Sequence, residues 1–493
     1  MFFPSINEVK QLATEGYNFI PVAVECSGDM ETPISVYKKL ERNKYCFLLE
    51  SVEGGQKIAR YSFIGRNPFL LFESRENLSK ITENGIETEK AGNPVHILEE
   101  ICSRYKSPDI PSMPRFSGGG TGFFSYDLVR SFEDLPNPPK DDTNIPESHF
   151  IFTDEVIAFD HLRHKIVVMV SMQINEGTDI DLAYSRAIRR IMDIQSELKA
   201  NVPQVTNKIK ALTGKTTQLK SNLTKEKYVE IVEKAKDYIK NGDIFQVVLA
   251  QRFTCDVDVD AFNVYRALRS INPSPYMYYL NFGDYEVVGA SPEMLLRVEN
   301  GVMQTCPIAG TRKRGATHEE DERLAAELLA DPKELAEHNM LVDLGRNDIG
   351  RVSEFGSVKV TDYKYIQRFS HVMHIVSNVE GRLQKDKTVF EALASVLPAG
   401  TLSGAPKIRA MEIIDELETV KRGVYGGAVC YVSFNGNFDS CITIRTAMIK
   451  NGKAHIGAGA GIVYDSVPEM EYEECINKAG AMFLALKEAG EMV

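Results

Sequence analysis

Two pairs of glutamates have the spacing that places carboxylates side by side on a helix. Glu334 and Glu337 lie three residues apart in KELAEHNMLVDL, and Glu471 and Glu474 lie three apart in PEMEYEECINKA. Both segments are expected to be helical, so each pair would project from one helical face. Four carboxylates held together repel one another unless a hard cation neutralises them. Mg²⁺ suits such oxygen ligands, and Lys478, one turn after Glu474, could pair with an anion.

The alternative is that both pairs face water, as most such pairs on helices do. The segments between Gln246 and Lys478 favour a site instead. In GASPEM, Glu293 follows an apolar strand and stands beside Pro292, so its carboxyl group lies at a strand end. Partial burial there would raise its pKa and suit it to act as a general acid. The simpler interpretation is a glutamate that starts a helix near a proline.

Further residues of the same region have the chemistry to bind anions. CPIAGTRKRG offers a strand, a glycine turn at Gly310 and a hydroxyl at Thr311. GTLSGAPKIRA is expected to be a loop that leads into a helix, with Thr401 available to bind oxyanions. We expect Arg445, in CITIRTAM, to be a strand residue that is paired structurally or directed at a carboxylate. GAGAGIV, at 457–463, has no bulky side chains, so an anion can reach its main-chain N–H groups.

The composition of the 493-residue chain is typical of a globular protein with ample material for a core. Its net charge of -12 argues against nucleic acid or an anionic membrane as the main partner. The eight cysteines are scattered without a CxxC pair, which indicates reduced thiols rather than disulfides or a zinc site. Without a signal peptide or a membrane-length apolar run, the chain is expected to be cytoplasmic.

The pattern of elements predicts an α+β fold with large, mostly antiparallel β-sheets packed against helices. Residues 1–200 are strand-rich, end in a helix at DIDLAYSRAIRRIMDIQSEL, and form the expected N-terminal regulatory or structural region. Residues 201–223 are polar and weakly periodic, and are expected to be a linker. Thr224 is expected to cap the first helix of a catalytic region, 224–493, in which hairpins alternate with long helices.

Two local patterns predict turns. Asn435-Gly436 separates YGGAVCYVSF from CITIRTAMI and is a strong hairpin signal. SGGGTGFF, at 117–124, lacks the spacing of a phosphate-binding loop and is expected to be a tight structural turn.

Ordered blocks from Thr224 to Lys478 closely resemble the chorismate-utilising enzymes. The blocks that carry this resemblance are DIFQVVLAQRF, NPSPYM, GASPEM, PIAGTR, ELAEHNMLVDLGRND, HVMH, GTLSGAPK, YGGAV, IRTA, GAGAGIV and EYEECINKA. So many blocks in one order form a highly specific signal. In the N-terminal part, LLES at 48–51 resembles the regulatory segment of anthranilate synthase component I.

Two positions favour the anthranilate synthase branch of this family. Relatives that form isochorismate or salicylate carry a water-activating lysine where this chain has Gln246. A neutral amide cannot deprotonate water, which fits an enzyme that uses ammonia. Many aminodeoxychorismate synthases carry a nucleophilic lysine in a PIKGT block, which here reads PIAGT, and Ala309 cannot form a covalent adduct. Gln251, where some relatives have arginine, is given no role.

The resemblance implies a Mg²⁺-dependent lyase that converts chorismate and ammonia into anthranilate and pyruvate, the first step of tryptophan biosynthesis. By the same resemblance, Glu337 and Glu474 bind Mg²⁺ directly, while Glu334 and Glu471 act through water. The ion would hold the ring carboxylate of the substrate and offset the charge that develops as the hydroxyl departs.

The resemblance also implies catalytic and substrate-binding residues. The catalytic residues would be Glu293, which protonates the leaving hydroxyl, His374, which assists the loss of pyruvate, and Gln246. The substrate carboxylates would be bound by a mixed set of side chains and main-chain groups: Gly310, Thr311, Thr401, Tyr425, Arg445, Gly459, Ala460, Gly461 and Lys478.

Partners follow from the resemblance as well. The chain contains no glutaminase motif, so glutamine-dependent activity is expected to need a separate amidotransferase subunit. Ser51 with Pro275, Tyr276 and Met277 resembles the family's pocket for L-tryptophan, which implies feedback inhibition. Neither nucleic acid nor a membrane is expected as a partner.

Two competing hypotheses remain at this point. Aminodeoxychorismate synthase is the nearest enzymatic alternative, and both Ala309 and the LLES segment disfavour it. The other is a non-enzymatic, amino-acid-binding regulatory protein that keeps the fold of an enzyme but has lost the activity. It is disfavoured because every carboxylate and cation that the chemistry needs is still in place.

Overall fold

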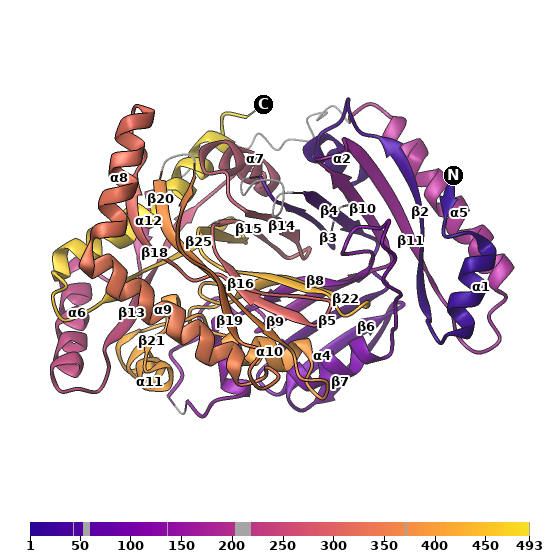
Figure 1. The fold of residues 1–493 in the computed structure, drawn as a ribbon. Helices are drawn as coiled ribbons and strands as arrows, with labels where there is room; N and C mark the ends of the chain where they lie inside the picture. Colours follow the sequence, from indigo (N-terminus) through magenta and orange to yellow (C-terminus); the bar gives the residue numbers. More distant parts are fainter. Residues whose placement is uncertain (43, 53–59, 136, 203–217, 370–371, 493) are drawn as a thin grey trace.

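The computed structural model describes residues 1–42, 44–52, 60–135, 137–202, 218–369 and 372–492. Two large β-sheets lie at the centre of the molecule, and helices cover their outer faces (Figure 1). The strands of both sheets pair antiparallel to their neighbours. The fold is therefore α+β with large antiparallel sheets, which confirms the prediction.

Within the described residues, the first sheet has 13 strands. Their order is β1 (Phe2–Phe3), β2 (Phe19–Ser27), β11 (Lys165–Gln173), β10 (Glu155–Asp160), β4 (Tyr61–Arg66), β3 (Cys46–Glu50), β14 (Tyr276–Asn281), β15 (Tyr285–Ser291), β24 (Thr446–Lys450), β25 (Lys453–Ile462), β13 (Gln246–Asp256) and β12 (Lys220–Ser221), with β21 (Gly404–Ala405) also paired to β13.

The second sheet has 12 strands in the same part of the chain. Their order is β18 (Ile308–Lys313), β20 (Val372–Arg382), β17 (Val302–Thr305), β16 (Met294–Glu299), β23 (Phe438–Ile442), β22 (Ala428–Ser433), β8 (Gly119–Phe124), β9 (Ser148–Thr153), β5 (Leu70–Arg75), β6 (Leu78–Glu83) and β7 (Ile86–Ala91), with β19 (Lys359–Arg368) paired to β20.

Helices complete a four-layer arrangement. The outer face of the first sheet packs against α1 (Ile6–Thr14), α2 (Pro33–Leu40), α5 (Ile180–Lys199), α6 (Lys225–Lys240), α7 (Ala261–Ile271), α11 (Lys407–Leu417) and α12 (Pro468–Ala489). The outer face of the second packs against α4 (Pro94–Ser103), α9 (Pro332–Gly350) and α10 (Val389–Val396), while α8 (His318–Ala330) lies on β18 and β20. The 3-10 helices of the described residues are η1 (Tyr126–Ser131) and η2 (Gly400–Leu402).

A third core lies between the two sheets and is rich in aromatic side chains. Phe47 and Tyr278 reach it from the first sheet, and Phe123 and Tyr431 from the second. Burial of such large apolar surfaces on both faces of each sheet stabilises the layered fold.

Both sheets contain strands from the N-terminal and the C-terminal parts of the chain. In the first sheet β3 pairs with β14, so that Glu50 lies opposite Met277. In the second sheet β8 pairs with β22. Most of the linker predicted at 201–223 lies outside the described residues, so the division into 1–200 and 224–493 stays a prediction. The sheets themselves are shared by the two parts.

Local signals in the sequence are confirmed at two places. Thr224 caps α6, and its hydroxyl accepts a hydrogen bond from the Lys227 N–H at 3.2 Å. The Asn435-Gly436 turn joins β22 to β23, and Gly436 has the positive φ of 88° that such a turn requires.

The prediction of a turn at SGGGTGFF is wrong, because Gly119–Phe124 forms strand β8 at the centre of the second sheet. Its glycines allow the backbones of the neighbouring strands β22 and β9 to approach closely. A Cβ on Gly119 would lie 2.1 Å from the Val432 carbonyl oxygen, and one on Gly122 would lie 2.0 Å from that of His149. The run therefore permits close approach of the neighbouring strands.

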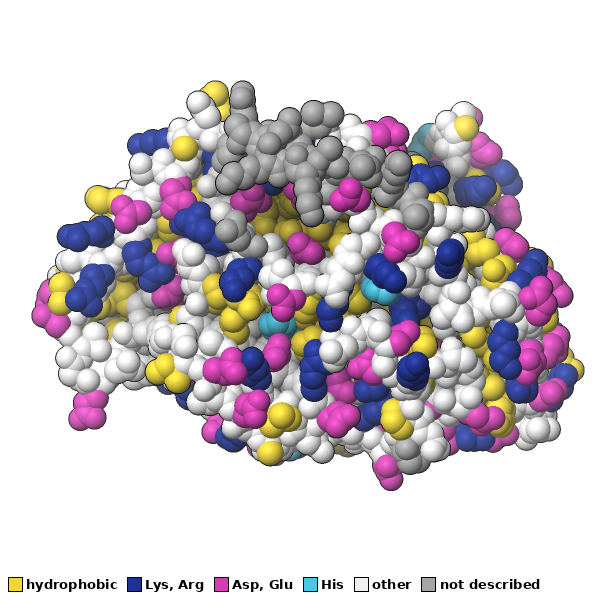
Figure 2. Space-filling view, turned by 180° about the vertical axis from the view of Figure 1, so that it is seen from behind, with side chains coloured by type: hydrophobic (Ala, Val, Ile, Leu, Met, Phe, Trp, Pro, Cys, Tyr) yellow, Lys and Arg dark blue, Asp and Glu magenta, His cyan; other side chains and the backbone are white. Residues whose placement is uncertain are grey.

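Acidic and basic side chains are mixed across the face shown in Figure 2, with apolar side chains scattered between them. Among the described residues, no helix is both long and apolar enough to cross a bilayer.

Candidate active site

One cavity of about 540 Å³ brings together nearly all the residues that the sequence predicts for the site. Its walls come from β13 and β25 of the first sheet, from β18 and β20 of the second, and from α9 and α12. The predicted residues that line it are Gln246, Glu293, Gly310, Thr311, Glu334, Glu337, His374, Thr401, Tyr425, Arg445, Gly459, Gly461, Glu471, Glu474 and Lys478. This volume is typical of sites for small molecules.

Ala460 is the exception among the predicted substrate-binding residues. It alternates with Gly459 and Gly461 along β25, opposite Leu249 of β13, and is fully buried in the core under the helices. Because neighbouring strand residues face opposite sides, the cavity wall is formed by the two glycines.

Both glutamate pairs lie in the first two turns of their helices. Asp331 caps α9, and its carboxylate accepts from the Lys333 N–H at 3.0 Å and the Glu334 N–H at 3.3 Å. α12 begins with Pro468, a residue that suits the first turn of a helix. The partial positive charge at a helix N-terminus favours nearby carboxylates. The predicted helices and the shared orientation of the two pairs are therefore confirmed.

The four carboxylates act on one another electrostatically. Burial raises the pKa of Glu337, and the charges of Glu334 and Glu474 raise it further. Burial likewise raises the pKa of Glu471, with an additional contribution from Glu474. The two helices thus bring their acidic groups to the same side of the cavity, where a cation would relieve their repulsion.

The structure holds these carboxylates apart rather than in a closed cluster. Among the described residues, no three His, Cys, Asp or Glu side chains come close enough together to hold a metal ion. Glu334 accepts from Arg312 at 3.2 Å, and Glu474 pairs with Lys478 at 2.7 Å. The donor set still fits Mg²⁺, which uses one or two carboxylates and completes its octahedral shell with water and substrate oxygens.

Glu293 lies between β15 and β16, as the sequence predicts, and its side chain is enclosed. Burial raises the pKa of its carboxyl group. The Thr401 hydroxyl donates a hydrogen bond to Glu293 Oε2 at 3.3 Å, and this contact and the charges of Lys478 and Arg445 act in the opposite direction. Burial is the largest of these effects, so the pKa of the carboxyl group stays above its usual value, which is the direction that suits a general acid.

His374 faces the same cavity from β20. Its Nδ1–H donates to the Gly310 carbonyl oxygen at 2.8 Å, so Nε2 is the nitrogen free to accept a proton. Burial lowers the pKa of the imidazole and keeps it neutral. Gly310 carries the contact because a bulge between Ala309 and Thr311 gives it a positive φ of 67°.

Arg445 is not in a strand, and this part of the prediction is wrong. The expected single strand ends at Ile442 and resumes at Thr446, because the chain passes there from the second sheet to the first. Arg445 lies in this crossover with a positive φ of 51°. Within the described residues its guanidinium forms no hydrogen bond or ion pair, and it faces the cavity. A carboxylate ligand would provide the missing partner.

Glycines of β25 shape the remaining wall. The ring of Tyr425 lies against Gly457, where an added Cβ would come within 2.3 Å of the ring. A Cβ on Gly461 would lie 2.8 Å from the side-chain nitrogen of Gln246. The glycine run therefore leaves space for Tyr425 and Gln246 to reach the cavity.

Comparison with known proteins decides the family. The model of the chorismate binding enzymes matches residues 44–484. The chain is 59% identical to anthranilate synthase component 1 of Acetivibrio thermocellus over the full length of both chains. It is 48% identical to that of Pseudomonas aeruginosa, over 99% of each chain. The chain belongs to the chorismate-binding enzymes, within the anthranilate synthase component 1 family.

Solved structures agree with this assignment. Anthranilate synthase component I from Streptococcus pneumoniae is 41% identical, with a TM-score of 0.78 over 93% of this chain and 98% of that chain. The menaquinone-specific isochorismate synthase of Escherichia coli is 18% identical, with a TM-score of 0.71 over 98% of each chain. The second likeness shows that the fold is shared beyond the anthranilate synthase family.

The four residues predicted for the tryptophan pocket of this family lie together. Ser51, Pro275, Tyr276 and Met277 line a second cavity of about 50 Å³. The Tyr276 hydroxyl donates to Asp439 at 3.0 Å. The Ser51 hydroxyl is buried without a hydrogen-bond partner among the described residues, a state that a polar ligand would relieve.

Some residues of the catalytic cavity were missed from the sequence. Lys333 and Ser466 line it beside the acidic pairs. The charge of Lys333 lowers the pKa of Glu337 and of Glu471, and the Ser466 side chain also lowers the pKa of Glu471. Lys333 directly precedes Glu334, so a cation beside an acidic pair was the available signal. Ser466 lies in a loop that has no motif of its own.

Proposed function

We propose that this chain is the synthase subunit that converts chorismate and ammonia into anthranilate and pyruvate. The observation that carries the proposal is the cavity itself. Within the described residues, it encloses a carboxyl group of raised pKa at Glu293, an arginine without a hydrogen-bond or ion-pair partner at Arg445, and four glutamates from α9 and α12. Glu293 can act as an acid, Arg445 can bind a carboxylate, and the glutamates can bind a cation. A reaction of a small dicarboxylate requires these three roles.

Mg²⁺ would be held by Glu337 and Glu474, with Glu334 and Glu471 in contact through water. When bound, it supplies Lewis-acid stabilisation of negative charge on the substrate. Arg445, Lys478, the hydroxyl of Thr311 and the N–H groups of Gly459 and Gly461 would bind the substrate carboxylates. Their convergence on one cavity supports this role.

In the first step the nitrogen of ammonia forms a bond to the ring, and the hydroxyl leaves as water with the proton of Glu293. The new ammonium group then loses one proton, which restores the carboxyl group of Glu293. Thr401 orients this carboxyl group through its hydrogen bond. In the second step the ring loses a proton as its bond to the enolpyruvyl oxygen breaks, so that the ring becomes aromatic. The enolpyruvyl group gains one proton at its methylene carbon and leaves as pyruvate. His374 is neutral and has Nε2 free, so it can accept a proton in this step.

Ammonia is the proposed nucleophile because Gln246 occupies the wall where a base would be needed to activate water. The amide of Gln246 is buried beside Gly461 and cannot remove a proton. Glutamine would supply the ammonia through a separate amidotransferase subunit.

L-Tryptophan is the proposed inhibitor, bound at the second cavity. That cavity is smaller than a tryptophan molecule, so binding requires it to widen. A direct structural link supports regulation: Tyr276 of β14 pairs with Ser291 of β15, two residues before Glu293.

The test is a fluorescence assay of the purified protein with chorismate, Mg²⁺ and excess ammonium salt. Blue-emitting anthranilate should form, and it should disappear with a chelator or in Glu293→Gln. A product that needs a separate lyase before an aromatic amine appears would support the aminodeoxychorismate alternative. Absence of chorismate turnover would support the regulatory protein.

A further inference from the structure

A buried ion pair lies directly behind the wall of the catalytic cavity. Glu418 follows the end of α11, and Arg422 lies one turn further along the chain. Their side chains are only 4% and 3% exposed. Neither residue lines the cavity. The pair therefore cannot touch the substrate and must act through other groups if it acts on the reaction.

Arg422 donates to the main chain of two separate segments. Its Nη1 donates to the Leu402 carbonyl oxygen at 2.6 Å, and its Nη2 donates to that of Val248 at 2.7 Å. Its Nε donates to Glu418 Oε2 at 2.9 Å. Glu418 in turn accepts from the Ala250 N–H at 2.8 Å. The pair thus fixes η2 and β13 relative to each other through charge-assisted hydrogen bonds.

Both segments carry residues of the proposed site. Leu402 directly follows Thr401, whose hydroxyl donates to Glu293. Val248 lies two residues after Gln246 on β13, and both Val248 and Leu402 line the cavity. A shift of either carbonyl would move the groups beside the general acid.

The guanidinium of Arg422 also lies near two aromatic rings. Its Cζ is 4.4 Å from the centre of the Tyr126 ring and 6.0 Å from that of Tyr425. Tyr425 forms part of the cavity wall and is confined on its other side by Gly457. Arg422 therefore bonds to η2 and β13 and lies near the Tyr425 ring, and all three border one cavity.

Stability alone is a poor explanation for such a pair. Removing two charges from water costs as much free energy as their attraction returns, and apolar replacements of buried pairs are often equally stable. The directed contacts to Leu402 and Val248 have a geometric consequence instead. We propose that Glu418 and Arg422 form a positioning unit that holds Thr401 on Glu293. This inference rests on the proposed role of Glu293 and adds residues to it.

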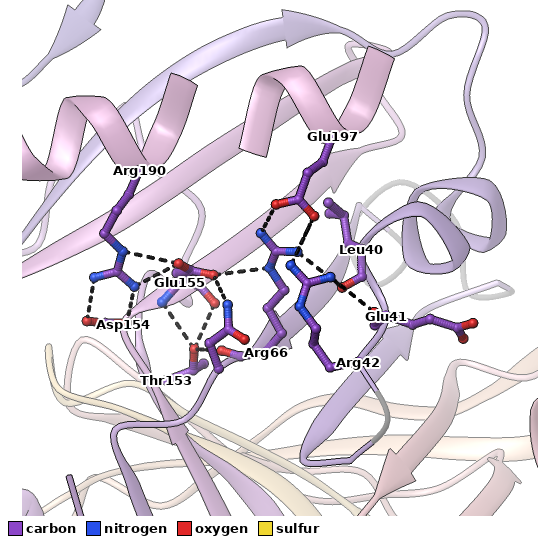
Figure 3. Close-up of polar contacts among 10 residues, drawn as sticks. Leu40, Glu41, Arg42, Arg66, Thr153, Asp154, Glu155, Arg190 and Glu197 are labelled. Atoms are coloured by element: carbon purple, nitrogen blue, oxygen red, sulfur yellow. Dashed lines mark hydrogen bonds and ion pairs between the residues drawn. The ribbon is translucent and has the colours of Figure 1, made fainter. Parts of the chain in front are cut away.

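A second buried ion pair of the same kind provides a control. Arg66 donates to Glu155 at 3.1 Å, and their side chains are 3% and 7% exposed. Figure 3 shows this pair in a network with Glu197 and Arg190 beneath α5. Arg66 and Glu155 contact no residue of the catalytic cavity in the described structure.

The experiment compares four proteins: wild type, Glu418→Gln/Arg422→Met, Thr401→Val, and the combination of these three substitutions. The Gln/Met pair leaves no uncompensated buried charge, which favours folding. Each of the first two variants should lose about 10- to 100-fold in kcat, with KM changed by less than about threefold. The combined variant should lose no more kcat than the more damaged of Glu418→Gln/Arg422→Met and Thr401→Val. The losses should not add, because both variants act through the one hydrogen bond from Thr401 to Glu293.

The pH profile distinguishes positioning from general damage. The Thr401 hydrogen bond lowers the pKa of Glu293, so the pKa should rise when this bond is lost. The pH above which the rate falls should therefore be higher in Glu418→Gln/Arg422→Met and in Thr401→Val than in wild type. Glu155→Gln/Arg66→Met should leave kcat and the pH profile as in wild type, whatever its thermal stability.

A crystal structure supplies a readout that does not depend on activity. In Glu418→Gln/Arg422→Met the Thr401 hydroxyl should no longer lie within hydrogen-bond distance of Glu293. An unchanged Thr401–Glu293 contact, or additive losses in kcat, would overturn the positioning role. An inactive wild-type protein would contradict the proposed function instead, and the crystal structure would still test the positioning.

Discussion

Glu293 and His374 owe their expected protonation states to one cause that acts on charges of opposite sign. Burial disfavours the charged form of each group. It therefore raises the pKa of the Glu293 carboxyl group and lowers that of the His374 imidazole. A carboxyl group of raised pKa and a neutral imidazole therefore lie in one cavity, which suits them to donate a proton in the first proposed step and accept one in the second.

The proposed Mg²⁺ ligands can be tested at a single residue. Glu337→Gln should lower Mg²⁺-dependent turnover about 100-fold or more, because a ligand to the ion is lost. The variant should fold, since it removes a charge that Glu334 and Glu474 repel. Mg²⁺ with chorismate should raise the melting temperature of wild type but not of Glu337→Gln. Glu319→Gln, at an exposed residue in the first turn of α8, is the matched control. Wild-type turnover in Glu337→Gln would remove the metal assignment.

Ser51 tests the proposed effector cavity. Ser51→Arg should fill this small cavity and abolish inhibition by tryptophan, while the uninhibited rate stays within about twofold. Ser51→Ala should weaken inhibition through loss of the hydroxyl. Ser79→Ala removes another buried hydroxyl without a partner, on β6, and should leave inhibition unchanged. The measurement is the tryptophan dose response of the fluorescence assay. Full inhibition of both Ser51 variants would exclude this cavity as the effector site.

At the scale of elements, local sequence signals predicted what local interactions determine. The helices that carry the glutamate pairs, the cap at Thr224 and the hairpin at Asn435-Gly436 all depend on residues a few positions apart. The cavity residues were predicted through ordered sequence blocks, because each block places its side chain on a particular element.

Features that depend on distant strands could not be predicted in this way. The strand at Gly119–Phe124 has glycines because Val432 and His149 approach it from other parts of the chain. Arg445 lies outside a strand because the chain passes there from β23 of the second sheet to β24 of the first. The Glu418–Arg422 pair has no motif, and its contacts to Val248 and Leu402 exist only in the folded chain.

Strand β25 gives a prediction at this scale. In Gly457→Ala the new Cβ would lie 2.3 Å from the Tyr425 ring, close to its backbone, so the ring must move. We expect about 1–3 kcal/mol of lost stability and a clear loss of turnover. Gly480→Ala is the matched control on α12, where a Cβ meets no atom within 4 Å. It should raise stability by up to about 1 kcal/mol. Unfolding in denaturant measures the change in stability, and the rate assay measures turnover. Wild-type stability and turnover in Gly457→Ala would contradict the packing of Tyr425 against Gly457.

The proposed catalytic cavity and the proposed effector cavity lie in one layered molecule. The first sheet continues from β3, which leads into Ser51, to β15, which leads into Glu293. Neither half of the chain completes a sheet alone, since β14 needs β3 and β22 needs β8.

This sharing predicts that residues 224–493 do not fold alone. The fragment would expose the unpaired edges of β14 and β22 together with the apolar core between the sheets. Circular dichroism and size-exclusion chromatography should show an aggregated or unfolded fragment. Co-expression of 1–200 with 201–493 should restore a folded, active complex. A stable, active 224–493 fragment would show that the two parts are independent domains.

We propose that chorismate reacts in the cavity lined by α9 and α12. The most direct test is a crystal structure of Glu293→Gln with chorismate and Mn²⁺, whose anomalous scattering locates the ion. We expect chorismate in the cavity with a carboxylate at Arg445 and the ion between Glu337 and Glu474. Chorismate bound elsewhere, or an ion that touches neither glutamate, would contradict this proposal.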